Sequence, residues 1–489
     1  MTAASERRDA SSGTADITCA VGLALVALIA AVLRILGWGH WSLWLDEAMT
    51  LDYTRRGLRG LWEILILDGN HPPAHYLVIY AVRRVSESDA ALRLPSVAFG
   101  VATTLALFVR CGGRRRAAVS LGAALAFAVS PLAVHYGQEV RPYSMALCFV
   151  AIADAARVTW RSGRSRLALG VWMSASVLAA YTLYIAVVAL ATMLLAEAVV
   201  AWRVRREDRG HLRATLAVAG CTIVLYLPWL WAIRHGLHQP PGEAPQLTLS
   251  AIWAELVGLA AGRDENLGRQ ASAALIWLVW MAGLVRAEAE EKWRLGLDLT
   301  GLTVGVLATL WWAHHWWSLR YLVVALLPLS RGIGESFDWA SALGVARARR
   351  ATAGFLALAI VVVQAPALAE NIESGRVDWR RAANYLEFEA SKGRGGEILA
   401  ADGWAYFCLR AQTTRQREPR DVVLTGSIAE LRAKIAASSD GWVARAPRHG
   451  SNVPAEIGVF LRSTSPWAIV HEAEDVRLYR FEKGVLVAP

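Results

Sequence analysis

The chain has 489 residues, of which 55% are hydrophobic, and it carries a formal net charge of +10. A soluble protein of this length seldom has so high an apolar fraction, so the composition favours a polytopic membrane protein. Basic cytoplasmic loops explain the net charge of such a protein, and nucleic acid is not an expected partner. The five cysteines show no metal-ligand spacing and mostly lie in or beside apolar runs, so a disulfide framework is not expected either.

Apolar runs predict about eleven transmembrane helices. Runs of roughly 17–22 residues recur along the chain, which is the length needed to cross about 30 Å of hydrocarbon. The first run, 17–37, lacks a following cleavage site and is expected to remain as an anchor. The other expected spans are 93–110, 117–133, 143–160, 166–182, 184–202, 214–234, 271–286, 296–313, 319–337 and 351–369.

Basic residues fix the expected orientation. They cluster in the N-terminal tail, 1–16, and in alternate connections, which begin near Arg110, Arg157, Arg203, Arg286 and Arg347. The positive-inside rule makes that side cytoplasmic. An odd number of spans then places the first loop and the C-terminal region outside, for a protein of the cell (inner) membrane.

The first extracytoplasmic segment, 39–92, is predicted to contain helices that lie at the membrane surface. Asp52 to Leu67 has an apolar face and predicts one amphipathic helix. Ala74 to Val82 is entered through two prolines, a favoured helix start, and is too short to span, so it is expected to be interfacial or re-entrant.

The last part of the chain, 371–489, has shorter apolar runs with interspersed charges, which indicates a small α/β domain. Helices are expected at 378–391 and 427–438, and strands at 397–401, 421–425, 441–445 and 475–479. The expected fold is therefore a polytopic α-helical membrane domain, 17–370, followed by a small extracytoplasmic α/β domain.

Polar clusters are expected to meet on the outer face. They are Asp46-Glu47, Asn70–Tyr76, His135–Tyr143 and, at the start of the tenth expected span, His314–Tyr321. Ionisable groups at the rim of a span are costly to place and indicate a functional site. A carboxylate there can act as a general base, arginines can hold a phosphate, and carboxylates with histidine can bind a divalent metal. The combination favours group transfer from a lipid-linked phosphate.

Each cluster also has a purely structural interpretation. Asp46 and Glu47 fit a helix cap or an ion pair with arginine, and His71 fits a helix entry. Glu139 and Arg141 fit an internal ion pair. The fourth cluster fits an interfacial anchor at the end of a span.

The chain resembles the GT-C superfamily of integral-membrane glycosyltransferases, and most of all the branch with the protein O-mannosyltransferases and the aminoarabinose lipid A transferase. The resemblance covers nearly the whole chain, although no single motif is specific. In the order typical of that family, the matching segments are Trp44–Glu47, Asn70–Tyr76, Leu92–Ser96, Gln138–Ser144, Arg320–Pro328 and Asp378–Tyr385.

The resemblance implies roles for individual residues. Asp46 matches the catalytic acidic residue of the first loop, Glu47 is its neighbour in the motif, and Glu139 matches the acid of the second loop. The expected substrate-binding residues are His71, Arg141, Tyr143, Arg320 and Tyr321. A divalent metal, which only some relatives use, would involve Asp46 and Glu139.

The resemblance also implies a polyprenyl-phosphate-linked sugar as donor and a lipid, glycan or protein as acceptor. A transporter or flippase of a lipid-linked substrate is the alternative. It would place polar or charged residues at mid-span and use broken helices, whereas the expected spans are nearly free of mid-membrane charge. A third possibility is an inactive scaffold that uses only its outer domain for binding.

Overall fold

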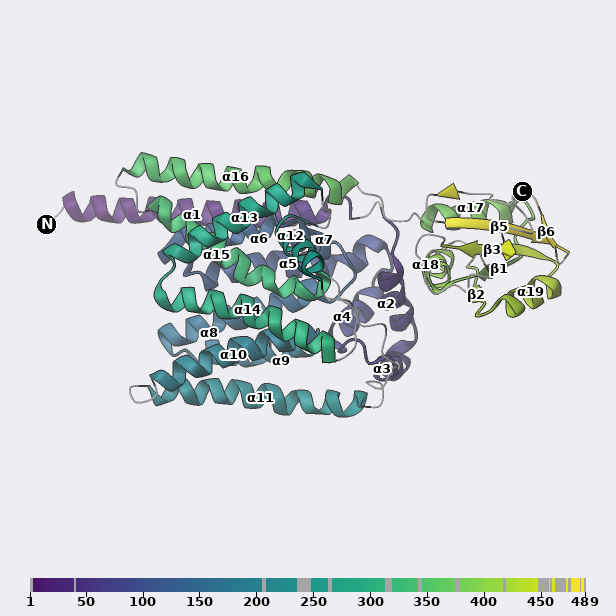
Figure 1. Cartoon of the computed structure of the whole chain (residues 1–489), viewed down its shortest axis with the longest axis horizontal. Helices are drawn as coiled ribbons and strands as arrows, with labels where there is room; N and C mark the ends of the chain where they lie inside the picture. Colours follow the sequence, from purple (N-terminus) through teal and green to yellow (C-terminus); the bar gives the residue numbers. More distant parts are fainter. Residues whose placement is uncertain are drawn as a thin grey trace. The chain divides into compact units, whose positions relative to one another are not determined.

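The computed structural model describes residues 3–38, 41–204, 208–234, 248–262, 266–312, 319–341, 345–373, 379–416 and 419–446, with short segments at 457, 460–461, 472–473, 476–483 and 485–487. The chain forms two compact units. The helical unit comprises Met1–Leu36, Trp62–Val78 and Ala91–Glu373, and the mixed unit comprises Gly37–Leu61, Ile79–Ala90 and Ser374–Pro489. Figure 1 labels the elements of both.

The helical unit contains most of the long helices. They are α1 (Ala3–Ile35), α5 (Asp89–Arg110), α6 (Ala117–Ala128), α7 (Pro131–Gly137), α8 (Tyr143–Gly163), α9 (Arg166–Ala180), α10 (Tyr184–Arg203), α11 (Arg209–Ile233), α12 (Leu249–Ala261), α13 (Leu267–Arg286), α14 (Ala289–Trp312), α15 (Leu326–Ser341) and α16 (Ala346–Glu373), with 3₁₀ turns η1 (Gly113–Arg116) and η3 (Leu319–Ala325). Helix α15 packs on α6 and α13, and α8, α9, α10 and α11 lie beside one another.

A helix occurs at every expected span, but not all of these helices have the character of a crossing. Among the described residues, six helices are long and apolar enough to span a membrane, and a seventh span results if the bent pair formed by 113–128 and 131–137 counts as one. The expected total of about eleven therefore stays a prediction. Helix α12 falls in a segment that was expected to be an outer loop.

The first loop differs from its prediction in one respect. The single amphipathic helix expected from Asp52 to Leu67 is wrong, because two helices, α2 (Leu45–Arg55) and α3 (Gly57–Asp68), occupy this region. They are separated at Gly57, whose φ of 75° belongs to the left-handed region that favours glycine. The short helix α4 (Ala74–Arg83) confirms the helix expected after the two prolines.

The expectation that the spans are nearly free of mid-membrane charge stays a prediction. A network of paired ionisable side chains, most of them buried, joins six helices of the helical unit at the ends that are predicted to be cytoplasmic. It comprises Arg110 (α5), Asp154, Arg157 and Arg161 (α8), Glu197 (α10), His211 (α11), Glu290, Glu291, Arg294 and Asp298 (α14) and Arg331 (α15). The hydropathy of each run concealed this network, since one or two charges barely change the mean of a long apolar window.

The mixed unit contains a six-stranded sheet. Its elements are β1 (Glu397–Ala400), β2 (Val422–Leu424), β3 (Asp440–Arg445), β4 (Glu472–Ala473), β5 (Val476–Glu482) and β6 (Val485–Val487), with helices α17 (Trp379–Ser391), α18 (Gly403–Thr413) and α19 (Ile428–Ala437). Strand β1 lies between β2 and β3, parallel to both, and β5 pairs with β3 in antiparallel fashion. The strands and helices expected from the sequence are confirmed, whereas α18, β4 and β6 were not anticipated.

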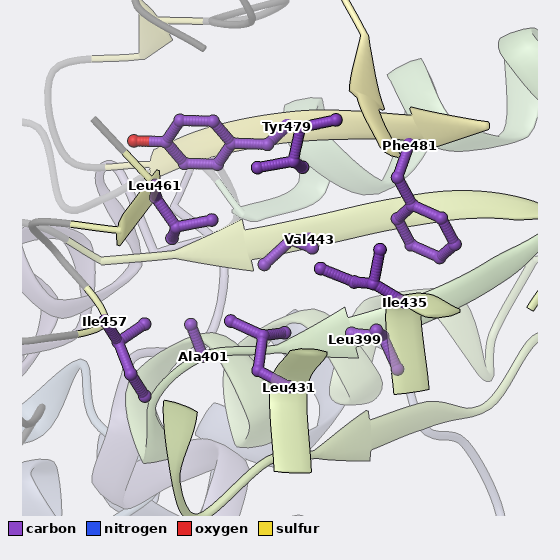
Figure 2. Packing of buried hydrophobic residues seen from close by; sticks show 10 residues of the cluster. Leu399, Ala401, Leu431, Ile435, Val443, Ile457, Leu461, Tyr479 and Phe481 are labelled. Atoms are coloured by element: carbon purple, nitrogen blue, oxygen red, sulfur yellow. The ribbon is translucent and has the colours of Figure 1, made fainter. Parts of the chain in front are cut away.

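One face of this sheet carries a compact apolar core (Figure 2). Leu399, Val443 and Phe481 come from three adjacent strands and pack with Leu431 and Ile435 of α19. Helices α17 and α18 pack against each other and contact the strands as well. The connections between β1, β2 and β3 therefore each contain one helix, as parallel strands require.

Candidate functional site

A bent helix pair presents the motif that was predicted around Glu139 and Arg141. Helix α6 ends at Ala128, and α7 begins at Pro131, with a bend of 61° between 113–128 and 131–137. Proline is favoured in the first turn of a helix, and the hydroxyl of Ser130 accepts a hydrogen bond from the amide of Ala133 at 3.4 Å. The chain then leaves α7 at Gly137 and starts α8 at Tyr143.

Side chains from neighbouring helices fix the backbone of this motif. Ser96 of α5 donates to the carbonyl oxygen of Glu139 at 2.5 Å, and Ser144 of α8 donates to that of Tyr136 at 2.9 Å. The side-chain amide of Gln138 in turn donates to two backbone carbonyls at the end of α1, those of Leu33 and Leu36, at 2.9 and 2.8 Å. These bonds satisfy polar backbone groups that have no partner within their own helices.

Arg34, near the end of α1, is the most unusual of the groups that support the motif. Its side chain is fully buried, and Nη1 donates to the carbonyls of Ala30 and Ala128 at 2.9 and 3.2 Å. The guanidinium also lies over the ring of Phe127, at 5.4 Å. Ala128 ends α6, so the cation sits at the negative end of that helix dipole.

Two glycines leave space for Arg34. A methyl group on Gly100 of α5 would lie 2.8 Å from Cδ of Arg34, and one on Gly137 would be equally close to Cγ, Cδ and Nε. Atoms cannot approach so closely without moving. The side chain thus occupies a slot between α5 and the last turn of α7, directly before the Gln138–Tyr143 motif.

Arg141 joins this motif to the segment Asn70–Tyr76. Its side chain is buried, and Nη2 lies 3.0 Å from Nε2 of His71. The segment that carries His71 is held in turn by α9 and α10, because the amide of Ala74 donates to Tyr181 O at 3.0 Å and Tyr184 donates to Gly69 O at 2.8 Å. The two predicted clusters do converge.

Asp68 and His75 lie within electrostatic reach of Arg141. Burial raises the pKa of Asp68, although a hydrogen bond from Asn70 and the charge of Arg141 oppose the rise. Burial lowers the pKa of His75 to about 3, and the charge of Arg141 acts in the same direction. His75 is therefore neutral at physiological pH, and it is hydrogen-bonded to the backbone of Val140.

Glu139, which follows α7, has its carboxylate beside the last turn of that helix. Oε1 lies 3.2 Å from Nε2 of His135, one turn earlier, and the side chain is buried. Among the residues that the structure describes, no group of three or more histidine, cysteine, aspartate or glutamate side chains is arranged to hold a metal ion. His135 and Glu139 supply two donors, fewer than the four of a zinc site or the six or more of a calcium site.

The remaining predicted residues of the helical unit are aromatic or lie beside aromatic rings. Tyr143 is buried at the start of α8, with its ring 4.5 Å from that of Tyr136 and 5.9 Å from the guanidinium of Arg141. Arg320 lies over the ring of Tyr321 at 5.4 Å, in the 3₁₀ turn η3. The histidines at 314 and 315 lie outside the described residues.

The acidic pair belongs to the mixed unit, where it opens α2. Glu47 is fully buried, and its carboxylate accepts a hydrogen bond from the backbone N–H of Trp44 at 3.2 Å, so it caps its own helix. Asp46, in the same first turn, is only partly buried. Negative charge is favourable at a helix N-terminus, and this applies to both side chains.

Helix α2 packs against α18 of the C-terminal region. The rings of Trp44 and Trp404 lie 6.2 Å apart, and Asp52 accepts a hydrogen bond from Arg410 at 2.8 Å. Burial raises the pKa of the Cys408 thiol well above its ordinary value, and the charges of nearby Asp402, Glu47 and Asp46 act in the same direction. These contacts place the acidic pair beside α18.

Sequence reasoning missed Arg34, Asp68 and Arg410, and it gave no role to His75. Arg34 did carry a signal, since it is the one charged residue within the first apolar run, 17–37. A charge inside a span is a functional or structural site by default. Nothing in the local sequence indicates the partners of Asp68 or Arg410.

Comparison with known proteins bears on the fold. No family model and no curated protein matches the sequence. The structure resembles the crystal structure of ArnT from Cupriavidus metallidurans in the apo state, with 12% identity and a TM-score of 0.59 over 95% of this chain and 99% of that chain. The form of that ArnT bound to undecaprenyl phosphate gives 13% identity and a TM-score of 0.58 over 94% of this chain and 97% of that chain.

A more distant likeness is to the Archaeoglobus fulgidus oligosaccharyltransferase in complex with Zn and sulfate. It has 12% identity and a TM-score of 0.50, and covers 83% of this chain and 62% of that chain. Identities this low establish the fold, not the activity. This chain therefore shares its fold with these ArnT structures.

Proposed function

We propose that this chain is a membrane glycosyltransferase that transfers a sugar from a polyprenyl-phosphate donor to an extracytoplasmic acceptor. The observation that carries the proposal is the convergence of two separate motifs on Arg141, a buried cation whose hydrogen-bond partner, His71, need not be charged. A guanidinium of this kind suits a phosphate ester. The shared fold supports the donor class, since the ArnT structure was solved with undecaprenyl phosphate bound.

In the proposed reaction, an acceptor hydroxyl or amine attacks the anomeric carbon of the donor. The new bond forms from the acceptor, the bond between carbon and phosphate oxygen breaks, and the polyprenyl phosphate leaves with the electron pair. Asp46 takes the proton of the acceptor as general base, and inversion at the anomeric carbon follows from the direct attack. Arg141 and Arg320 stabilise the departing phosphate.

The other predicted residues have supporting roles. Glu139 orients the acceptor, and His71 and Tyr143 hold Arg141 in place, while Tyr321 does the same for Arg320 through its ring. Glu47 supports Asp46 by fixing the first turn of α2. No step passes through a metal, although Asp46 and Glu139 are the acids that would serve an ion such as the Zn of the archaeal structure.

The proposal includes the expected arrangement in the membrane. We propose about eleven crossings in the cell (inner) membrane, a cytoplasmic tail at 1–16, a transmembrane domain at 17–370 and an extracytoplasmic domain at 371–489. Labelling of single introduced cysteines from either side tests this topology. Modification of a cysteine in the α/β domain only after permeabilisation would contradict it.

The central experiment compares Asp46→Asn with Glu47→Gln. Both remove one negative charge from the same turn, and glutamine can still accept the hydrogen bond from Trp44. Asp46→Asn is expected to lower the transfer rate by about 10²-fold or more, as loss of a general base does, while Glu47→Gln keeps most of it. A total extract of lipid-linked sugars serves as donor, with products followed by mass spectrometry. An Asp46→Asn variant that folds and transfers sugar at the full rate would contradict the assignment of Asp46 as the general base.

A transporter or flippase is the alternative, and the buried ion network is the observation in its favour. Its carboxylates are paired with arginines, as Asp154 is with Arg157 at 2.6 Å and Glu197 is with Arg157 at 2.5 Å. Charges that are fully paired suit a structural joint better than a transport path. Flux of lipid-linked sugar in proteoliposomes without sugar transfer would support the alternative.

A further inference from the structure

Two segments of the first extracytoplasmic loop form one structural unit with the C-terminal region. The mixed unit joins Gly37–Leu61 and Ile79–Ala90 to Ser374–Pro489, so the loop with the acidic pair shares a compact body with a domain more than three hundred residues later in the chain. The C-terminal domain is thus part of the structure that holds the acidic helix α2. Neither the strand pattern of the C-terminal domain nor the sequence motifs predict that this domain contacts α2.

Polar contacts secure this joint at several points. The hydroxyl of Ser42 accepts a hydrogen bond from the amide of Trp379 at 3.0 Å, and Arg55 donates to Thr414 at 2.5 Å. Arg380 pairs with Asp89 at 2.6 Å, and Arg415 pairs with the same carboxylate. These contacts tie the two loop segments to α17 and to the end of α18.

Arg410 of α18 contacts Asp52 of α2, the helix that begins with the acidic pair. Its Nη1 lies 2.8 Å from Oδ1 of Asp52, and the two side chains are 30% and 14% exposed. The guanidinium of Arg410 also donates to the hydroxyl oxygen of Tyr406, one turn earlier on α18, at 2.9 Å, and lies over the Tyr406 ring at 5.5 Å. The arginine is therefore held on α18 independently of α2, and it can act as a fixed point for Asp52.

The helix transmits this anchor to Asp46. Asp46 and Asp52 are six residues apart on α2, which corresponds to about 9 Å along a rigid helix axis. The opposite end of the same helix is fixed where Trp44 packs on Trp404. With both ends of α2 attached to α18, the direction of the Asp46 side chain depends on the C-terminal domain.

We propose that Arg410 is a positioning residue for Asp46, and that the C-terminal domain orients the acidic residue of the site through the pair between Arg410 and Asp52. The inference rests on the proposed function, in which Asp46 is the general base. Arg410 does not touch the reacting atoms. Its effect passes through α2.

The test measures the maximal transfer rate of the full chain in nanodiscs, with a total extract of lipid-linked sugars as donor. Arg410→Gln is expected to lower this rate about 10- to 100-fold, since small misplacements of a reacting group have effects of that size. Binding of undecaprenyl phosphate, measured separately, stays within twofold of the unaltered chain. Hydrogen exchange of the α2 amides, 45–55, becomes faster. A general loss of structure would weaken the binding of undecaprenyl phosphate as well as the transfer rate. A lower transfer rate with unchanged binding therefore indicates a change in the orientation of Asp46.

The chain offers matched controls on both sides of the pair. Asp421→Asn removes the other carboxylate partner of Arg410, 3.0 Å away, and Arg56→Gln removes the other arginine partner of Asp52, also at 3.0 Å. Neither of these contacts joins α2 to α18. Both variants are expected to keep the rate and the exchange of α2 within twofold.

Restoration of the charge should restore the rate. Arg410→Lys is expected to recover at least half of the lost rate on a logarithmic scale, and the exchanged pair Asp52→Arg with Arg410→Asp is expected to exceed both of its single variants. Asp52→Asn removes the same ion pair by changing its partner on α2. If Arg410→Gln does not fold, Asp52→Asn is measured in its place.

A folded Arg410→Gln or Asp52→Asn variant with the rate and α2 exchange of the unaltered chain would overturn the inference. That result leaves the proposed function intact as long as Asp46→Asn is inactive. Full activity of Asp46→Asn would instead overturn the proposed function, and the exchange measurement would still report whether Arg410 fixes α2.

Discussion

The buried ion network of the helical unit predicts a large loss of stability when its central carboxylate is neutralised. Glu197 of α10 is fully buried and accepts hydrogen bonds from Arg157 at 2.5 Å and from Arg294 at 2.6 Å, while Nε2 of His211 lies 2.5 Å away. These partners come from three other helices, α8, α14 and α11. Glu197→Gln keeps the shape of the side chain and removes its charge.

The size of the effect follows from what the partners lose. Breaking a buried pair by removing one charge costs about 3–5 kcal/mol, because the other charge is left uncompensated. Here Arg157 keeps Asp154 at 2.6 Å, and Arg294 keeps Glu290 at 3.0 Å. The expected loss for Glu197→Gln therefore lies at the lower end, about 3 kcal/mol.

Glu290→Gln is the matched control for this prediction. Glu290 pairs with Arg294 and Arg161, two of the arginines around Glu197, but its side chain is 46% exposed. A pair open to solvent contributes about 0–1 kcal/mol. Thermal unfolding in detergent, followed by tryptophan fluorescence, measures both variants. Equal unfolding temperatures for the two variants would refute the view that burial decides the strength of this network.

Two further predictions concern Gly100 and His75, which lie near the Gln138–Tyr143 motif. Gly100→Ala places a methyl group in the space that the Arg34 side chain occupies. We expect this variant to destabilise the chain by about 1–3 kcal/mol and to lower the transfer rate. The control is Gly220→Ala in α11, where a methyl group meets nothing within 4 Å and both the stability and the transfer rate are expected to stay unchanged. Burial holds the pKa of His75 near 3 in the folded chain. When the pH is below about 6.5, the pKa of histidine in the unfolded chain, only the unfolded chain takes up the proton. The stability therefore falls by about 1.4 kcal/mol for each pH unit between about pH 6.5 and pH 3. His75→Gln should remove that part of the pH dependence of thermal unfolding, and an unchanged slope between pH 6.5 and 5 would contradict the burial of a neutral histidine.

Much of the secondary structure follows from the sequence alone. Helices α5, α11 and α16 coincide with apolar runs, because the length of a run and its mean hydropathy are local properties. The helix start at Ala74 and the strands β1 and β3 were also predictable, from a proline pair and from short apolar runs in a charged region. The break at Gly57 was not, since the apolar periodicity continues across it.

The candidate site was only half predictable. The motifs contain residue types that can bind a phosphate and transfer a proton, and they single out Asp46, Glu139 and Arg141 as candidates. They left open which of these side chains meet. A pattern in the sequence reports whether a side chain faces an apolar surface, but not which distant side chain lies opposite.

Tertiary structure decided the partners. It brought Arg141 to His71 across 70 positions, and it assembled a charge network from helices that each read as ordinary apolar spans. It also joined Asp52 to Arg410 across 358 positions, within the unit that combines Gly37–Leu61 and Ile79–Ala90 with the C-terminal region. Most helices and the acidic motif follow from the sequence alone, since they depend on neighbours along the chain. The partners of the buried charged groups depend on tertiary packing, because an ion pair forms between side chains that are close in space and not between neighbours in the sequence.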